Sequence, residues 1–218
     1  MCIRDRSFTA EAADTDIIEI SNEDELISFA NSCRNDSYSF GRKVKLTSDI
    51  SITKDGFEGI AYFNGTFDGG NHTIRNLNKE YIGSDYGFFR YLGEDAYVYN
   101  LSVSGTITAS GSQKNIGGIA GVNKAGARLI NCNSDADISA TNQTGGIAGN
   151  NQGIISGCIS RSKVNTNELN SSFDIGGVDV GTLNITQHVV DRNDMGGIAG
   201  YSTGVISVSY THLTLPTN

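Results

Sequence analysis

Short runs of apolar residues between glycines recur along this chain, and one of them, Gly-Gly-Ile-Ala-Gly, occurs three times. The copies begin at Gly117, Gly145 and Gly196, and the first two lie 28 residues apart. Each of these two is followed by an asparagine, a glycine, a pair of large apolar residues and a cysteine, in that order. Recurrence at this period is typical of a solenoid, in which each coil buries its apolar face against its neighbours. The runs are too short for helices, so we expect the coils to be built from β-strands.

The start of the chain has a different pattern. Ile17–Ile20 alternates and is predicted to be a strand, and Ser21 stands three residues before Asp24, as in a capping box. Apolar residues then follow at helical spacing: Leu26, Ile27, Phe29, Ala30 and Cys33. We expect a helix over residues 21–34 that caps the first coil, because the end of a solenoid otherwise exposes a sheet edge and its core.

Less regular coils are predicted between this helix and the glycine signature. Residues 44–46 and 50–52 alternate as strands do, and Asp68-Gly69-Gly70-Asn71 is a dense turn signal between two further strands. Shifted by 31 residues, Gly87-Phe88-Phe89 lies over Gly118-Ile119-Ala120, so the repeat is expected to begin near residue 87. Phe88 is then a core residue.

The rhythm changes between the second and third copies, which are 51 residues apart. Gly176-Gly177-Val178 resembles a degenerate copy of the signature, surrounded by polar sequence. We therefore expect a longer, partly irregular coil over residues 165–195.

The two ends of the chain are related to each other at the level of codons. One codon choice for residues 1–5 has a reverse complement that encodes Val-Ser-Tyr-Thr-His, the sequence of residues 208–212. Such ends look like sequencing adapters, so residues 1–6 and 208–218 are set aside as a scar; the alternative is two true termini with chance complementarity. Residues 7–13 are typical of the tail of a signal peptide, or of a flexible acidic leader. The predicted domain is a single β-helix over residues 14–207, an internal piece of a longer gene.

Composition narrows the classes of partner. The net charge is −8, or −9 once Arg4, Arg6 and Asp5 are set aside, which argues against nucleic acid and against anionic membranes. Glycine is abundant, with 27 residues, as suits a fold with many tight corners. No segment is long and apolar enough to span a bilayer, and no motif predicts a cofactor.

The Gly-Gly-Ile-Ala-Gly copies resemble GLUG repeats, which are found in large bacterial surface proteins and in IgA-specific metalloendopeptidases. The segment from residue 63 to residue 74 and the helix ahead of it resemble the upstream part of the same proteins. This resemblance implies a right-handed parallel β-helix and an extracellular setting. The peptidase's His-Glu-x-x-His motif is absent, because neither His72 nor His188 is followed by glutamate. The catalytic role is therefore not carried over.

Several residues recur at matching places in the repeat. Asn76, Asn100 and Asn131 each precede an apolar residue, and their amides are expected to stack along the axis at a corner, or to form a polar binding ladder. Cys132 and Cys158 share one slot, for which the earlier coils supply Leu101 and Leu77. We expect buried thiols there, although a disulfide between neighbouring coils satisfies the Cα separation.

Acidic residues give weak candidates for a metal or catalytic site. Asp135 and Asp137 lie two apart on a predicted strand and so share one face. They are candidate calcium ligands or paired carboxylates, but the sequence places no Lys or Arg beside them, and a solvated face is the plainer interpretation. Asp68 and His72 are predicted to stabilise the Gly-Gly turn. We expect no bound metal.

Aromatic residues concentrate between residues 81 and 99. Rings on the face of a solenoid can stack on sugars or grip peptides. The candidate ligand contacts are Tyr81, Tyr86, Tyr91 and Tyr97, although tyrosine is also a common strand residue.

The sequence therefore predicts a non-catalytic extracellular or cell-surface module of a bacterium. It would serve in adhesion, in ligand binding or as a spacer, with a glycan or a host protein as the partner. The alternative is the accessory β-helical region of a larger secreted enzyme, either a zinc metalloprotease of the IgA-specific type or a polysaccharide-degrading enzyme.

Overall fold

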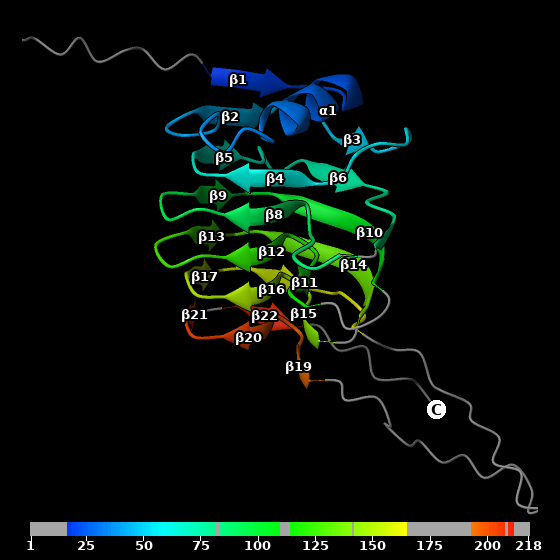
Figure 1. Cartoon of the computed structure of the whole chain (residues 1–218), viewed down its shortest axis with the longest axis vertical. Coiled ribbons are helices and arrows are strands. Elements are labelled where there is room, and N and C mark those ends of the chain that lie inside the picture. The colour runs from blue at the N-terminus through cyan, green and yellow to red at the C-terminus, as the bar shows by residue number, and fades with distance from the viewer. Residues whose placement is uncertain are drawn as a thin grey trace, which may run out of the picture.

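The computed structural model describes residues 17–81, 83–109, 114–140, 142–164, 193–207 and 209–211. Its strands stack in parallel as the coils of a solenoid (Figure 1). In chain order the elements are β1 (Ile17–Ile20), α1 (Glu23–Ser32), β2 (Lys43–Leu46), β3 (Ile50–Ser51), β4 (Ile60–Phe63), β5 (Thr66–Asp68), β6 (Thr73–Arg75), β7 (Lys79–Tyr81), β8 (Phe89–Leu92), β9 (Tyr97–Tyr99), β10 (Ser102–Ala109), β11 (Ile116–Gly117), β12 (Ala120–Asn123), β13 (Arg128–Ile130), β14 (Asn133–Ser139), β15 (Asn142–Gly145), β16 (Ala148–Asn151), β17 (Ile154–Ser156), β18 (Ile159–Ser160), β19 (Asn193–Gly196), β20 (Ala199–Ser202), β21 (Val205–Ser207) and β22 (Tyr210–Thr211).

Four parallel sheets form the walls of the solenoid. Sheet A has the order β1-β2-β5-β9-β13-β17-β21, sheet B runs β22-β18-β14-β10-β6-β3 with β7 also on β10, sheet C runs β20-β16-β12-β8-β4, and sheet D is β11-β15-β19. A complete coil visits sheets D, C, A and B in turn, and the five strands of sheet C mark about five turns. In Figure 1 the near strands run leftward and the fainter rear strands rightward as the chain descends, so the coils wind right-handed. The predicted parallel β-helix is confirmed.

The register of the coils follows the sequence repeats. Phe89 pairs with Ala120, and Ile107 with Ile138, which is the predicted shift of 31 residues. Phe88 is fully buried, as expected.

The third copy of the signature stacks directly on the second. Ala148 pairs with Ala199 at a shift of 51 residues, so no coil lies between β16 and β20. The degenerate copy at Gly176-Gly177-Val178, and most of the irregular coil expected over residues 165–195, lie outside the described part of the chain. β22 lies beyond residue 207, in the segment set aside on sequence grounds, and pairs with β18.

Helix α1 lies at the N-terminal end of the stack (Figure 1). Its predicted apolar stripe is confirmed, because Leu26, Phe29 and Cys33 are buried and Phe29 packs edge-on against Phe63 of β4. The start is one residue later than predicted: Asn22 is the N-cap, and its side chain accepts from the Glu25 N–H at 3.0 Å. The Glu25 carboxylate accepts from the Ser21 N–H at 2.7 Å, so this glutamate bonds the residue before the N-cap.

The core changes character along the axis. The coils nearest the helix are filled by a cluster of rings in mutual edge-to-face contact: Phe63, Phe67, Phe88 and Phe89. The coils that carry the signature have smaller residues inside: Ile119, Ala120, Ile147 and Ala148.

Glycine is required in the signature by packing. A Cβ at Gly118 would overlap Ser134 Oγ and come within 2.6 Å of the Gly146 carbonyl oxygen. A Cβ at Gly146 would overlap Ser160 Oγ and the Gly197 carbonyl in the same way. Gly118 and Gly146, the second glycines of the first two copies, thus allow close contact between neighbouring coils, and Ser134 and Ser160 are buried beside them.

The asparagine ladder is at a different place from the one predicted. Asn100 and Asn131 do stack, at φ of 55° and 51°, and Gly157 takes the same left-handed corner in the next coil. Asparagine and glycine are the residues that tolerate this conformation. Asn76 is not in this column, because the turn Gly69–His72 occupies the corner of its coil and Leu77 lies beside Gly105 instead.

The amides that pair along the axis are those of Asn123 and Asn151, which stand two residues after the first two copies of the signature. Both are fully buried, and Asn123 Nδ2 donates to Asn151 Oδ1 at 2.7 Å. Asn151 Nδ2 donates in turn to Ser202 Oγ at 3.0 Å. In the earlier coils, Phe63 and Leu92 hold the equivalent positions.

Cys132 and Cys158 are buried free thiols on neighbouring coils, as expected. The Cys132 N–H donates to Cys158 Sγ at 3.4 Å, and burial raises the pKa of the Cys132 thiol. Leu101 occupies the slot above them. Leu77 does not occupy this slot, because it lies beside Gly105 instead.

Candidate functional site

The four tyrosines predicted as ligand contacts lie in different surroundings. Tyr86 is fully buried, so the prediction that it is an exposed contact is wrong. Tyr81 is partly buried, with its ring centre 4.7 Å from that of Tyr86. Tyr91 lies half-buried on sheet C, and Tyr97 is 38% exposed on sheet A. They do not form one surface.

The acidic pair on sheet B is a solvated face. Asp135 and Asp137 both point outward on β14, as predicted. The sequence interpretation that no basic residue lies beside them is wrong, because the next coil brings Arg161 to 3.8 Å of Asp135 and Lys163 to 3.7 Å of Asp137. Each carboxylate thus has a cationic neighbour, which leaves little ligand capacity for a metal ion.

Asp68 and His72 stabilise their turn, as predicted. The Asp68 carboxylate accepts from the Gly70 N–H at 2.9 Å, closing an Asx turn. His72 Nδ1 lies 3.3 Å from Asp49 Oδ1, and that carboxylate also accepts from the Thr73 N–H and from Arg75. The Thr73 N–H, together with Arg75, lowers the pKa of Asp49.

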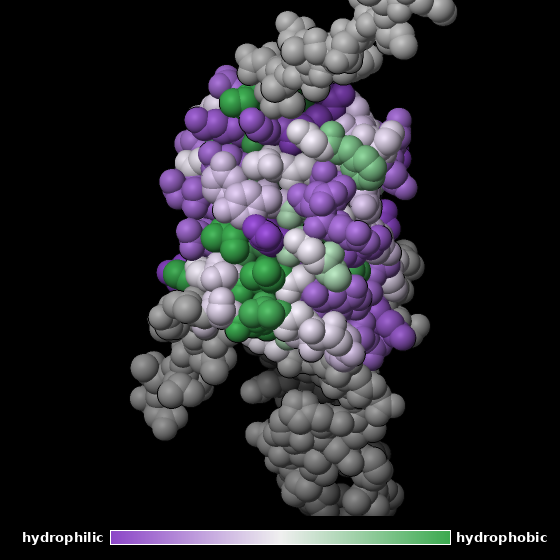
Figure 2. All heavy atoms as spheres, turned by 90° about the vertical axis from the view of Figure 1, so that its left-hand side faces the viewer, coloured by the Kyte–Doolittle hydropathy of each residue, from purple (hydrophilic) through white to green (hydrophobic). Residues whose placement is uncertain are grey.

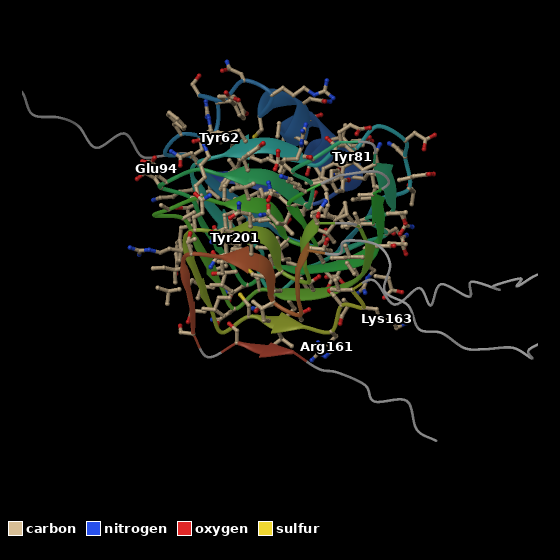
Figure 3. All side chains as sticks on the ribbon, turned by 60° about the horizontal axis from the view of Figure 1, so that its bottom comes forward. Tyr62, Tyr81, Glu94, Arg161, Lys163 and Tyr201 are labelled. Carbon is tan, nitrogen blue, oxygen red and sulfur yellow. The ribbon has the colours of Figure 1, made fainter. Side chains whose placement is uncertain are left out.

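A pocket lies at the corner between sheets C and A, near the N-terminal end. Its cavity volume is about 480 Å³. The lining side chains are aromatic and polar: Phe40, Tyr62, Asn64, Thr66, Glu94 and Asp95, with Gly41 and Gly65 between them. We call it the corner pocket. Figure 3 shows Tyr62 and Glu94 on one side of the molecule and Tyr81 on the other.

The carboxylates are carried by a turn that Asn64 holds in place. Glu94 and Asp95 occupy the centre of a turn closed by the Ala96 N–H on the Gly93 carbonyl at 3.0 Å. Asn64 Oδ1 accepts from the Asp95 N–H at 2.8 Å, and Asn64 Nδ2 donates to the Asp95 carboxylate at 3.3 Å. A Cβ at Gly93 would overlap both Asn64 and the Tyr62 hydroxyl, so glycine lets this turn approach the ring.

The opposite wall of the corner pocket, which carries Phe40, is held by hydrogen bonds of the buried Ser39 hydroxyl. Ser39 Oγ accepts from the Asn64 N–H at 2.9 Å and donates to the Tyr62 carbonyl at 3.4 Å. Gly41, at φ of 66°, places its N–H on the Asn64 carbonyl at 3.3 Å. The Phe40 ring stays 54% exposed, with its centre 6.2 Å from that of Tyr62.

Tyr62 begins an outward column along sheet C. Its neighbour in register is Tyr91, and the column continues through Val122 and Asn150 to Tyr201. The Lys124 ammonium lies 5.4 Å from the ring centre of Tyr62 and 5.9 Å from that of Tyr91, within the range of a cation–π contact.

The pKa values of the Tyr62 and Tyr91 hydroxyls in this column are raised. Burial, with help from Glu94, Asp36 and Asp95, raises the pKa of Tyr62. Burial, and a hydrogen bond donated to the Asp85 carboxylate, raise the pKa of Tyr91 to about 12. The Tyr91 phenol donates to Asp85, and the Tyr62 phenol can donate to a ligand.

A second aromatic surface adjoins the corner pocket on sheet A. Tyr97 pairs in register with Thr66 of the pocket wall, and its ring stacks on Tyr99 with 5.0 Å between centres. Further along the same column come Arg128, Ile154 and Val205. Figure 2, which faces this side, shows hydrophobic residues gathered in a strip over the lower coils.

Sequence reasoning missed Phe40, Tyr62, Glu94 and Asp95. They come from two coils and from the connection that follows α1, so no local motif joins them. A usable signal was the corner after each sheet C strand, where Asn64-Gly65, Gly93-Glu94-Asp95-Ala96 and Lys124-Ala125 fall in successive coils. Aligning these corners would have stacked the carboxylates against the asparagine that holds them.

In the part of the chain that the structure describes, no group of three His, Cys, Asp or Glu residues is arranged to hold a metal ion. Nor does any helix in that part have the length and apolar character needed to cross a membrane. Comparison with protein-family models, with curated proteins and with solved structures found no match. The fold and the site define a parallel β-solenoid with a preformed aromatic and acidic pocket at one corner.

Proposed function

We propose that this chain is a non-catalytic extracellular or cell-surface module of a bacterium that binds a glycan in the corner pocket. The resemblance of the signature to GLUG repeats and the signal-like residues 7–13 support the setting. The pocket supports the ligand class, and one observation carries the proposal: two accessible ring faces and two carboxylates meet at a single preformed corner.

This chemistry suits a sugar. The apolar face of a pyranose packs on an aromatic ring, and its hydroxyls donate to carboxylate oxygens. A cavity of about 480 Å³ lies within the usual range for small-ligand sites. Tyr97 and Tyr99 lie one coil further on, next to Thr66, where a second unit of an oligosaccharide would stack.

The pocket is ordered before a ligand arrives. Asn64 and Ser39 are 7% and 0% exposed, and their hydrogen bonds fix both walls. Ligand binding therefore orders few side chains or loops and loses little conformational entropy. This favours measurable affinity from a small contact area.

A glycan array probed with the labelled full chain tests the proposal. We expect binding to a subset of glycans, and we expect Phe40→Ala and Tyr62→Ala each to weaken it by more than about fivefold, as the truncation of a central aromatic anchor does. Tyr201→Ala is the matched control, because Tyr201 is 40% exposed in the same column but lies at the far end of the stack. The proposal fails if no glycan binds, or if the Tyr201 variant loses binding as much as the Tyr62 variant does.

A further inference from the structure

The charge around the corner pocket is unevenly distributed. The Glu94 and Asp95 side chains are exposed at its wall, and Asp36 is close enough to act on the Tyr62 hydroxyl. Asp95 accepts one side-chain hydrogen bond, from Asn64, and Glu94 makes none in the described part of the chain. Two carboxyl groups with spare acceptor capacity therefore face the cavity.

The nearby cations, Arg42 and Lys124, contact aromatic rings. The Arg42 guanidinium lies 4.5 Å from the ring centre of Tyr38, and Arg42 Nε donates to the Tyr38 carbonyl at 2.6 Å. The Lys124 ammonium lies over Tyr62 and Tyr91. Neither forms an ion pair with Glu94 or Asp95, so neither carboxylate has a direct cationic partner in the described part of the chain.

We infer that the corner pocket selects glycans with amino-sugar units and discriminates against glycans with acidic units. The inference rests on the proposed function and names the substrate class of that site. A protonated amine donates to Glu94 or Asp95 while its ring lies against Phe40 or Tyr62, and the exposed Phe40 ring attracts the same cation. A uronic acid or sulfated unit instead places like charges together in a space partly shielded from water.

The test measures calorimetric binding of the full chain to three tetrasaccharides at about pH 6, where ordinary carboxyls are ionised. These are a glucosamine tetramer, an N-acetylglucosamine tetramer and a galacturonate tetramer. We expect the amine form to bind about fivefold more tightly than the acetylated form at about 20 mM salt, which is the scale of a partly exposed charge pair. This ratio should fall toward one at about 500 mM salt, and the galacturonate should bind most weakly.

Glu94→Gln is the first variant, because Glu94 makes no hydrogen bond whose loss would disturb the fold. It should reduce the preference for the amine, because the amine form loses a charged partner, whereas the acetylated form keeps an amide oxygen that accepts from its hydroxyls. Asp137→Asn is the matched control, since Asp137 is an exposed carboxylate on sheet B. The inference is overturned if the acetylated and amine forms bind equally, if galacturonate binds as tightly, or if the preference survives in Glu94→Gln. In each of these results the proposed function stands, whereas binding of none of the three tetramers would count against both.

Discussion

Single residues decide how closely the coils of this protein approach one another. Gly118 and Gly146 have ordinary backbone angles, and each lies against a buried serine and against the backbone of the next coil. The repeat of Gly-Gly in the sequence predicts tight corners. The buried serine columns beside the glycines could not be predicted, because Ser134 and Ser160 look like ordinary surface positions of an alternating strand.

Gly146→Ala should therefore destabilise the fold by about 2–3 kcal/mol, the upper part of the range for overpacking, because backbone as well as side chain must move. Urea unfolding measures the change. Ala125→Ser adds one atom at an exposed turn in the same region and should leave stability within about 0.5 kcal/mol. If both variants unfold at the same urea concentration, the packing explanation of the signature is wrong.

Tyr91 gives the protein a pH-dependent stability on the alkaline side. Its pKa is raised to about 12, from about 10 in an unfolded chain, so its neutral form is favoured by folding. The stabilisation is complete below about pH 10 and is lost as the pH rises through about 12. Urea melts at a series of alkaline pH values should show a steeper decline for the wild type than for Tyr91→Phe. Parallel declines would contradict the assignment.

At the scale of elements, the sequence predicted each class of structure but placed some boundaries wrongly. The stripe from Leu26 to Cys33 identified α1, but the N-cap is Asn22 rather than the predicted Ser21. Glu25 bonds both residues, because its N–H donates to Asn22 Oδ1 and its carboxylate accepts from the Ser21 N–H. The 31-residue shift aligned β8 with β12, whereas the alignment of Asn76 failed. The four-residue turn over residues 69–72 shifts Asn76 out of register with Asn100. Such an insertion can be recognised only once the strands have been paired.

The pairing of Asn123 with Asn151 links β12 to β16 through the interior. Asn123→Ala should cost about 1–3 kcal/mol, because it leaves the buried Asn151 carbonyl oxygen without its donor. The double variant Asn123→Leu with Asn151→Leu should be less destabilising than Asn123→Ala, since it removes both polar partners and Leu92 already fills this position one coil earlier. Thermal unfolding of the two variants measures the difference. A double variant that is much less stable than the single one would show that the ladder is more than a satisfied buried pair.

For the whole molecule, the sequence predicted the parallel solenoid because its evidence is periodic and repeated. It did not predict the corner pocket, because the pocket depends on which corners stack. Phe40 comes from the connection after the helix, Tyr62 from one coil and Glu94 with Asp95 from the next. Of the predicted tyrosines, Tyr97 adjoins the pocket and Tyr91 lies beside Tyr62, but Tyr86 became part of the core. A pattern of aromatics along the chain does not tell which rings point inward at an irregular corner.

The most direct test of the central claim is a crystal structure of the full chain grown with the glucosamine tetramer. We predict one sugar ring against Phe40 and Tyr62, with its amine within hydrogen-bond distance of Glu94 or Asp95. A tetramer bound at another face, or an empty corner pocket at saturating tetramer, would contradict the account.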